Sequence, residues 1–364
     1  MNSSEYCVVL PCNINIAPYY QSYERLFISK NLPFDLIIWD RELSEEQTFA
    51  KNVFKFSKKD IPNNKNWLKI ISYFKFASFV KNKLKKNSYK KVIFLSTSGA
   101  TVVLLNGFLK KYYNKKYWID IRDYSFEWFI PYKNGLAKAI DNSFKTSISS
   151  PAFTRFLPKG DFSIVHNIDF KSIDDFINHQ EELEQIDSDK IRISFVGSVR
   201  YFEENKKQLE FFKNDTRYVL QFYGSRANQL KGYCEDNNIH NVDFHDRFDS
   251  SETYRFYQRT DIINNVYGNN SFELTTALSN KLYFSVALKK PIIVSSDTYL
   301  ASIVVDNGFG YVLKYVDEDK DNLYKWYFEL INSKDYHDKC NDFYNNAVNE
   351  YKANQKLLED FLHV

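Results

Sequence analysis

The sequence predicts an α/β protein with two doubly wound domains, each built on a parallel sheet covered by helices on both faces. Three observations predict this fold. Short apolar runs rich in β-branched and aromatic residues recur along the chain, helical patterns separate them, and the alternation occurs twice, on either side of an acidic stretch. The length of 364 residues also exceeds what one core usually holds.

The first half contains seven candidate strands with helical patterns between them. We predict strands at Tyr6–Leu10, Phe34–Trp39, Val53–Phe56, Val92–Leu95, Tyr117–Ile121, Thr146–Ser149 and Ser163–Val165, and helices such as Tyr19–Lys30 and Ala100–Tyr113. The stretch 92–109 carries no charge, but the Ser, Thr and Gly residues at its centre favour a buried strand, a turn and a helix over a membrane span.

The second half repeats the alternation and sets the domain boundaries. We predict strands at Ile191–Val196, Tyr218–Tyr223, Val242–Phe244, Asp261–Asn265, Pro291–Val294 and Gly310–Leu313, and helices at about Lys206–Lys213, Arg226–Asp236, Glu252–Arg259, Asn280–Lys289 and Tyr299–Asp306. We therefore expect a first domain at 1–168, a polar linker at 169–190 and a second domain at 191–344, with a final helix at about 345–364 that packs back on the first domain.

Charge is concentrated in the first half, although the whole chain has a net charge of only +3. Residues 51–120 hold 17 lysines and two acidic residues. Within this region the stretch 66–86 has helical spacing, an apolar stripe and a basic flank. Two explanations remain open, a core helix with a solvated lysine face or a helix attracted to an anionic membrane surface. Arginine is absent from this patch and no nucleic-acid motif occurs, so we expect no nucleic-acid partner.

Two features indicate the compartment. The four cysteines have no CxxC spacing and are typical of reduced thiols rather than of a disulfide framework. Residues 1–6 are polar, and the apolar run 7–10 is too short for the core of a secretory signal. We therefore expect a cytoplasmic protein, or one held peripherally at the inner face of the membrane.

Parallel sheets bind ligands at the carboxyl ends of their strands, so residues just after strands are the candidates. In the first half these are Asn13 and Asn15, which could hydrogen-bond a ligand or belong to a turn. Asp120, Arg122 and Asp123 could position or deprotonate a hydroxyl group of a ligand, or form a structural ion pair.

In the second half the candidates centre on a helix start. Ser279 or Asn280 can cap the predicted helix, whose free N–H groups suit a diphosphate, and Lys281 in its first turn adds a positive charge. Arg200 could bind the same anion in a bidentate manner or be structural. Gly197 and Gly224 permit close approach of a ligand or form plain turns, and Tyr267 could line a ligand pocket or belong to the core.

No metal or cofactor is expected. The chain contains neither a Walker A motif nor GxGxxG, and its histidines lack metal-site spacing. The acidic triplets 187–189 and 317–319 lie in polar stretches away from strand ends, so we interpret them as solvated loops.

These segments, in this order, resemble bacterial glycosyltransferases of the GT-B fold, similar to family-4-type enzymes of capsule, O-antigen and exopolysaccharide assembly. The stretch SNKLYFSVALKKPIIVSSDT is similar to the family's P-x-K-L-x-E-x-x-A-x-G-x-P-V-I helix and strand, and ISFVGSVR is similar to the first strand and loop of its donor domain. FYG, with Tyr223, matches the next strand end, and VDFHDR, with Arg247, matches the loop that touches the nucleotide base. VHN resembles the end of the acceptor domain and DIRD a strand end there.

One departure concerns the family's E-x(7)-E motif, whose second carboxylate binds the donor ribose. The corresponding positions here are Thr276 and Phe284, while Glu273 lies three residues from the first. The ribose and sugar contacts therefore cannot be carried over from the resemblance.

The resemblance implies two Rossmann-like domains facing a central cleft and a metal-independent hexosyltransferase. Its donor would be a nucleotide diphosphate sugar, most simply UDP-linked, and its acceptor a saccharide or polyprenyl-linked saccharide of a surface polysaccharide. The resemblance also implies that Asn13 and Asn15 could hydrogen-bond the acceptor sugar and that Tyr267 could line the sugar pocket. Asp120, Arg122 and Asp123 could then position or deprotonate the acceptor hydroxyl. Two alternatives remain open: a non-catalytic transferase-like subunit that binds a glycan or a partner enzyme, and a nucleotide-sugar 2-epimerase, which shares the architecture.

Overall fold

The structure, a computed structural model, describes residues 4–17, 19–59, 66–96, 100–178, 190–249 and 252–363. The chain divides into two compact units. The first contains the residues up to Asn167 and those from Glu350 onward, and the second contains Ile168–Asn349. The α/β fold class predicted from the sequence is confirmed, because each unit has its own all-parallel sheet between helices.

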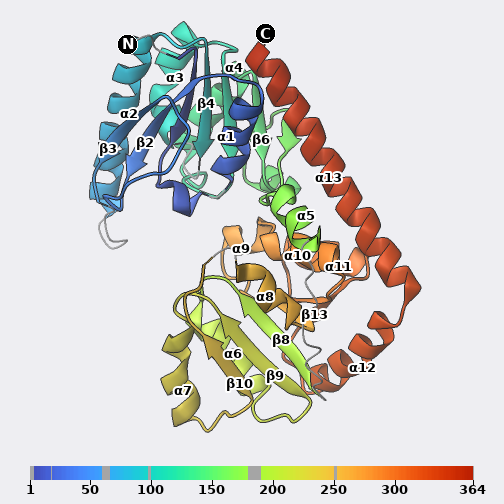
Figure 1. The fold of residues 1–364 in the computed structure, drawn as a ribbon. Coiled ribbons are helices and arrows are strands. Elements are labelled where there is room, and N and C mark those ends of the chain that lie inside the picture. The colour runs from blue at the N-terminus through green and yellow to red at the C-terminus, as the bar shows by residue number, and fades with distance from the viewer. Residues whose placement is uncertain are drawn as a thin grey trace. The chain divides into compact units, whose positions relative to one another are not determined.

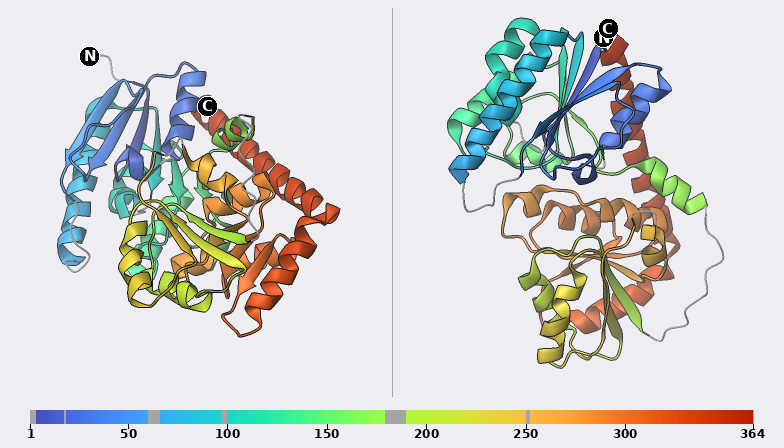
Figure 2. Two further views of the ribbon diagram at one scale, coloured as in Figure 1. Left: turned by 60° about the horizontal axis from the view of Figure 1, so that its bottom comes forward. Right: turned by 60° about the vertical axis from the view of Figure 1, so that its left-hand side comes forward.

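The first sheet has seven strands in the order β3-β2-β1-β4-β5-β6-β7. Its strands are β1 (Tyr6–Leu10), β2 (Phe34–Asp40), β3 (Asn52–Ser57), β4 (Lys91–Ser96), β5 (Tyr117–Ile121), β6 (Lys145–Ile148) and β7 (Phe162–Ile164). Its helices are η1 (Ile14–Ile16), α1 (Tyr20–Ser29), α2 (Asn66–Asn87), α3 (Ala100–Tyr112), α4 (Ile130–Asn142) and η2 (Pro151–Arg155). Helices α2, α3 and α4 cover one face of this sheet, and α1 with the end of α13 (Lys334–His363) covers the other (Figures 1 and 2).

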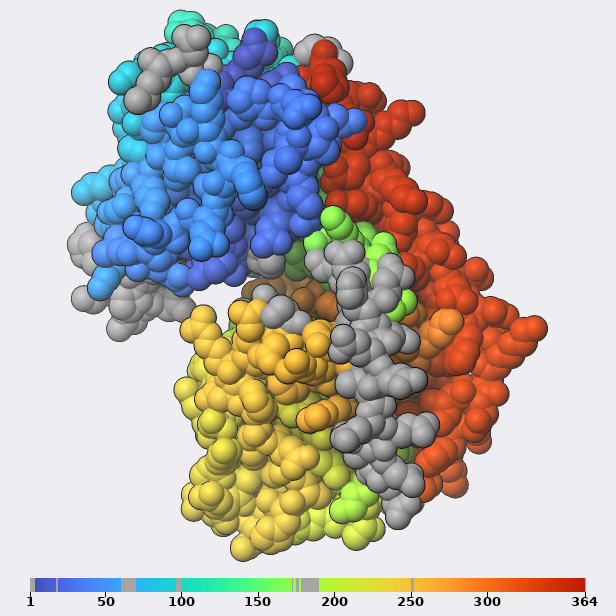
Figure 3. All heavy atoms as spheres, viewed as in Figure 1, coloured from blue at the N-terminus to red at the C-terminus, as the bar shows by residue number. Residues whose placement is uncertain are grey.

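The last turns of α13 complete the core of the first unit. Leu358, Phe361 and Leu362 are buried against α1 and the strands, and Tyr6 donates a hydrogen bond to the Leu362 carbonyl at 3.0 Å. These turns lie along the surface of the first unit as red spheres in Figure 3. Residues 1–167 therefore need the end of the chain to close their core.

The second sheet has six strands in the order β10-β9-β8-β11-β12-β13. Its strands are β8 (Ile191–Val196), β9 (Tyr218–Tyr223), β10 (Val242–His245), β11 (Ile262–Asn265), β12 (Ile292–Ser295) and β13 (Gly310–Leu313). Its helices are α5 (Phe170–Asn178), α6 (Phe202–Phe211), η3 (Ala227–Leu230), α7 (Lys231–Asp236), α8 (Thr253–Gln258), α9 (Phe272–Thr276), α10 (Asn280–Leu288), α11 (Tyr299–Asp306) and α12 (Asp319–Ile331).

Part of the segment 169–190, which we expected to be a linker, is helical. Helix α5 belongs to the second unit, where the Phe170 ring contacts Tyr283 and Tyr344 at centroid distances of 5.9 and 5.7 Å. Residues 179–189, including the acidic triplet 187–189, lie outside the described residues.

Both sheets reverse their strand order once, and this fixes where ligands bind. The reversal falls between β1 and β4 in the first sheet and between β8 and β11 in the second. Ligands of such sheets bind outside the carboxyl ends of the strands at this point. None of the helices in the described parts of the chain is long and apolar enough to cross a lipid bilayer.

Candidate functional site

A buried lysine marks the reversal point of the second sheet. Lys281 lies in the first turn of α10 and is only 3% exposed. Its ammonium group donates a hydrogen bond to the Tyr267 hydroxyl at 2.8 Å and lies 4.4 Å from the centre of the Phe195 ring. Within the described residues it has no carboxylate partner. A buried cation without a counter-ion is costly, so this position suits an anionic ligand.

The backbone around Lys281 adds to its positive character. Ser279 caps α10 by accepting a hydrogen bond from the Lys281 N–H at 3.2 Å, whereas the side chain of Asn280 is exposed. The remaining free N–H groups of this first turn carry the positive end of the helix dipole. A cation at this end of a helix is unfavourable unless an anion binds there too, which again points to an anion site.

Two glycines at neighbouring strand ends lie beside this lysine. Gly197 ends β8 and Gly224 ends β9, with φ angles of +132° and +137° that side chains rarely adopt. A Cβ on Gly224 would lie 2.1 Å from the Gly197 carbonyl oxygen, and one on Gly197 would lie 3.5 Å from the Lys281 ammonium group. The glycines thus let the two strand ends touch and leave room for a ligand next to Lys281.

The loop from β8 to α6 supplies a second cation. Arg200 is exposed, and its carbonyl accepts a hydrogen bond from Asn205 at 2.6 Å. Next to it, Tyr201 has a left-handed backbone and its ring contacts Tyr267 at 5.7 Å. Burial and then Glu273 raise the pKa of Tyr201, while Arg200 opposes them, so Arg200, Glu273 and Tyr267 all lie near this ring.

Aromatic rings cluster at the ends of β9 and β10. The Tyr223 ring lies 4.6 Å from Phe256, and Phe256 in turn contacts Phe248 at 4.3 Å and His245 at 5.1 Å. Burial raises the pKa of Tyr223 to about 12. Arg247 is exposed on the same loop. A planar base could stack at this end of the sheet.

Thr276 and Phe284, which replace the two carboxylates of the E-x(7)-E motif, make contacts within the second unit. Phe284 stacks on Tyr257 with a centroid distance of 4.6 Å, and the Thr276 hydroxyl donates to the Phe272 carbonyl. Glu273 is exposed in the first turn of α9.

Sequence reasoning missed Asn265, which ends β11. Asn265 is 6% exposed, and its Oδ1 is buried without a hydrogen-bond partner among the described residues. A buried carbonyl left unpaired is unfavourable, so a ligand or water is expected to bind it. The strand-end rule selects this position, but its burial is visible only in the structure.

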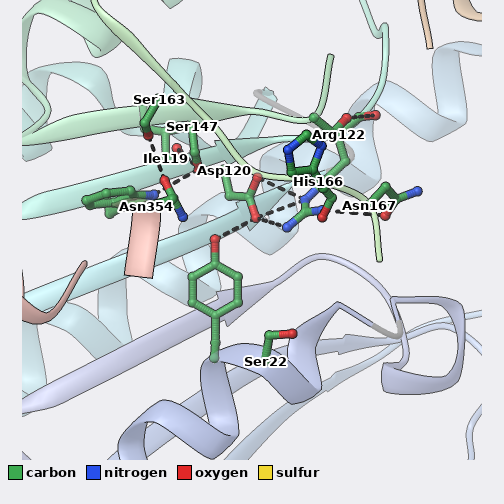
Figure 4. Close-up of polar contacts among 12 residues, drawn as sticks. Ser22, Ile119, Asp120, Arg122, Ser147, Ser163, His166, Asn167 and Asn354 are labelled. Atoms are coloured by element: carbon green, nitrogen blue, oxygen red, sulfur yellow. Dashed lines mark hydrogen bonds and ion pairs between the residues drawn. The ribbon is translucent and has the colours of Figure 1, made fainter. Parts of the chain in front are cut away.

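In the first unit, Asp120 and Arg122 bind each other. Asp120 is fully buried, and its two oxygens accept hydrogen bonds from Arg122 at 2.8–3.0 Å and from the Tyr23 hydroxyl at 2.7 Å (Figure 4). Arg122 also donates to the His166 carbonyl and lies 4.3 Å from the Tyr19 ring centre. Burial opposes the charge of Arg122, but Asp120 outweighs it and raises the pKa of Arg122. The geometry favours the structural ion pair.

Asp123 lies at the same strand end. It is half-buried, and it raises the pKa of Cys12, although burial makes the largest contribution in bringing that pKa to about 12. Asp123 acts in the same way on Tyr19, whose pKa burial also raises. The Tyr19 hydroxyl is buried without a hydrogen-bond partner among the described residues. Like the unpaired Asn265 oxygen, it was not indicated by the sequence.

Asn13 supports a loop. Its amide nitrogen donates to Asp40 at 2.9 Å and Glu46 at 2.5 Å, and its oxygen accepts from the backbone N–H groups of Arg41 and Glu42. Both ends of this fully buried amide are therefore engaged. Asn15 is exposed and donates to Glu42 at 2.7 Å.

The described residues contain no group of three or more His, Cys, Asp or Glu side chains that could hold a metal ion.

No protein-family model matches this chain, and no curated protein is significantly similar to it in sequence. Solved structures do share its fold. Sucrose-phosphate synthase from Thermosynechococcus elongatus is 11% identical, with a TM-score of 0.69 over 99% of this chain and 100% of that one. A UDP-forming α,α-trehalose-phosphate synthase from Burkholderia xenovorans, in complex with glucose-6-phosphate, is 8% identical, with a TM-score of 0.67 over 98% and 100%.

The UDP-GlcNAc 2-epimerase from Neisseria meningitidis, bound to UDP-GlcNAc, is 13% identical, with a TM-score of 0.62 over 98% and 100% of the two chains. Identities this low establish the fold alone. The chain therefore has the GT-B fold, with two Rossmann-like domains, which glycosyltransferases and this epimerase share.

Proposed function

We propose that this protein is a glycosyltransferase that moves a sugar from a nucleotide diphosphate donor, most simply a UDP-sugar, to a saccharide or polyprenyl-linked saccharide. The observation that carries the proposal is the buried Lys281 ammonium group beside Gly197, without a counter-ion among the described residues. The similarity to the UDP-forming synthase supports a nucleotide-sugar donor, since the shared fold extends over nearly all of both chains.

The donor would bind at the carboxyl edge of the second sheet. Lys281, the first turn of α10 and Arg200 would hold the diphosphate, and the base would stack near Tyr223 and Arg247. Tyr267 would then line the sugar pocket. Asn265 would accept a hydrogen bond from a donor hydroxyl, which compensates for the carboxylate that Phe284 replaces.

Bond cleavage would depend on stabilising the leaving nucleoside diphosphate. Two cationic side chains and a helix dipole can neutralise its developing charge, so we propose that the transfer needs no metal. In the first unit, Asp123 would orient or deprotonate the acceptor hydroxyl, and the Asp120–Arg122 pair would position the strand end that carries it. Asn15 would contact the acceptor sugar, and Asn13 would hold the loop beside it.

The biological role we propose is surface-polysaccharide synthesis, such as capsule or exopolysaccharide assembly, at the inner face of the cytoplasmic membrane. A polyprenyl-linked acceptor lies in that membrane, and the lysine-rich stretch 66–86 could contact its anionic surface.

Thermal unfolding with UDP, GDP, CMP and their sugars tests the donor site. UDP is expected to raise the melting temperature of the wild type by mass action. Lys281→Met should weaken UDP binding about 10- to 100-fold, because a charge-assisted contact is lost. Lys290→Met is the matched control, since that lysine donates to the Thr260 carbonyl elsewhere in the second unit. A wild type that binds none of these nucleotides would refute the proposal and favour a non-catalytic subunit.

A second candidate, a nucleotide-sugar 2-epimerase, is favoured by the similarity to the UDP-GlcNAc 2-epimerase. The carboxylate at the end of β5 argues against it, because both oxygens of Asp120 are already hydrogen-bonded. Incubation with UDP-GlcNAc and analysis of the sugar distinguishes the two. An epimerised nucleotide sugar without an acceptor would identify the epimerase.

A further inference from the structure

The first unit exposes a group of large apolar side chains on two neighbouring elements. We call this group the apolar patch. It consists of Trp128 (70% exposed), Phe129 (49%) and Ile130 (70%) before and at the start of α4, and of Ile70 (48%), Ile71 (40%) and Phe74 (57%) in the first turns of α2. Tyr73 of α2 contacts Phe126 of the loop before α4 at a centroid distance of 6.2 Å, so this loop packs against α2.

Such a patch is unusual on a surface that faces only water. Single exposed apolar residues are ordinary, but three consecutive large ones in a loop that packs against a helix with three more indicate an interaction site. Trp128 is the most informative member, because tryptophan prefers the boundary between water and lipid headgroups. Three consecutive apolar residues that project from a loop can enter that boundary without unfolding a secondary-structure element.

The exposed side of α2 changes character along its length. Ile71, Phe74, Ser78, Lys81 and Lys85 are spaced by three and four residues and are all exposed, so they form one stripe on the helix. The stripe is apolar at its beginning, where Ile71 and Phe74 belong to the apolar patch, and basic toward its end.

The helix layer around this stripe is also basic. Helix α3 packs beside α2 and has Lys110 and Lys111 in its last turn. Neither helix contains an aspartate or a glutamate. An apolar patch continuous with a positive field complements an anionic phospholipid surface. A second copy of this chain would bring the same lysines together, which like-charge repulsion disfavours.

We infer that Trp128, Phe129 and Ile130 insert into the headgroup region of an anionic bilayer while the lysines of α2 and α3 bind its phosphates. This goes beyond a purely electrostatic contact of the stretch 66–86, because it identifies the element that enters the lipid. Membrane binding itself does not depend on the proposed function, and only its biological purpose rests on that function. Trp128 shares a loop with Asp123, so insertion would bring the acceptor-binding edge of the first sheet to the membrane, where a lipid-linked acceptor lies.

Vesicle binding tests this directly and needs no enzyme activity. The full chain is mixed with vesicles of phosphatidylcholine alone or with added phosphatidylglycerol, and the bound fraction is measured by sedimentation at low and high salt. Binding is expected with phosphatidylglycerol, with loss at high salt. Brominated acyl chains should quench tryptophan fluorescence in the wild type, and less in Trp128→Phe, which keeps the apolar surface.

Two pairs of variants separate insertion from charge. The double variant Trp128→Ser with Ile130→Ser should lower partitioning about tenfold or more. Lys81→Glu with Lys85→Glu should do the same through charge. The matched controls lie in the second unit: Phe272→Ser, which removes a ring that is 57% exposed, and Lys213→Glu with Lys231→Glu, both exposed. These controls should bind as the wild type does.

Three results would overturn the inference. One is a wild type that stays unbound with phosphatidylglycerol at low salt. Another is equal quenching in wild type and Trp128→Phe. The third is a concentration-dependent dimer that the Trp128→Ser and Ile130→Ser changes abolish, which would assign the patch to a second copy. If vesicle binding holds but UDP does not bind, the surface stands and the proposed function fails.

Discussion

At the scale of single residues, the buried polar groups of this protein are of two kinds. In the first unit Asp120 and Asn13 are saturated with hydrogen bonds from other parts of the protein. In the second unit Lys281 and Asn265 are buried with unused bonding capacity. Saturated groups stabilise the fold, whereas groups with unused capacity indicate a ligand.

This difference predicts that Asp120→Asn mainly destabilises the protein. The amide keeps the size of the side chain but leaves the buried Arg122 without its counter-charge, which costs about 3–5 kcal/mol. Urea denaturation of wild type and variant measures the loss. Asp161→Asn is the control, because Asp161 is 87% exposed and pairs with Lys145 at the surface, a pair worth at most about 1 kcal/mol. An Asp120→Asn protein that is as stable as the wild type but inactive would instead assign Asp120 to catalysis.

At the scale of elements, the contact between the β8 and β9 ends shapes the proposed donor site. The Gly197 N–H donates to the Tyr223 carbonyl at 2.8 Å, and the Gly224 N–H donates to the His245 carbonyl at 2.9 Å. These bonds continue the ladders past the strands and hold the two glycines together beside Lys281. The arrangement depends on the absence of side chains at both positions.

We therefore expect Gly224→Ala to disturb stability and ligand binding together. Its Cβ would meet the Gly197 carbonyl oxygen, and its φ of +137° is strained for alanine, so we expect a loss of about 2–4 kcal/mol and weaker UDP binding. Denaturation and calorimetry check both. Gly232→Ala is the control, because nothing lies within 4 Å of its Cβ in α7, and there alanine should be neutral or stabilise by up to about 1 kcal/mol. Equal effects of the two changes would contradict this role for the glycine contact.

The elements also show how far the sequence could predict this fold. Each of the thirteen predicted strands corresponds to one of β1–β13, because continuous apolar runs rich in β-branched and aromatic residues are distinctive. Helices α4, α5, α9 and α12 were missed. Helix α4 begins with Ile130–Pro131 after an aromatic stretch, and α5 lies in the polar segment interpreted as a linker. Helix α9 has only about one and a half turns, and α12 follows an acidic segment interpreted as a loop.

The candidate site could be predicted only in part, for a physical reason. The strand-end rule selected Gly197 and Gly224, and the predicted helix start selected Lys281, since both depend on local order along the chain. The role of Asn13 depends on Asp40 and Glu46, which lie 27 and 33 residues away. The unpaired polar atoms of Tyr19 and Asn265 stand out only because they are buried, and no local sequence pattern encodes that burial.

At the scale of the whole molecule, each unit has a separate sheet and a separate hydrophobic core. We expect two unfolding transitions in calorimetry. UDP should stabilise only the second unit and raise its free energy of unfolding by about 2.7 kcal/mol when its concentration is 100 times the dissociation constant. Trp39 and Trp118 are buried in the first unit, so their fluorescence changes when that unit unfolds. A UDP shift of that transition, or one joint transition, would contradict independent units.

Helix α13 has a consequence for how the chain is made. The hydrophobic contacts of Leu358, Phe361 and Leu362 are part of the core around α1, and Tyr6 is tied to Leu362. During synthesis the N-terminal sheet emerges first but cannot finish folding until residue 362 has been translated. The second unit, whose contacts are complete earlier, is therefore free to fold first, and the nascent N-terminal half must wait with an open apolar groove, the state in which a chaperone would be needed most.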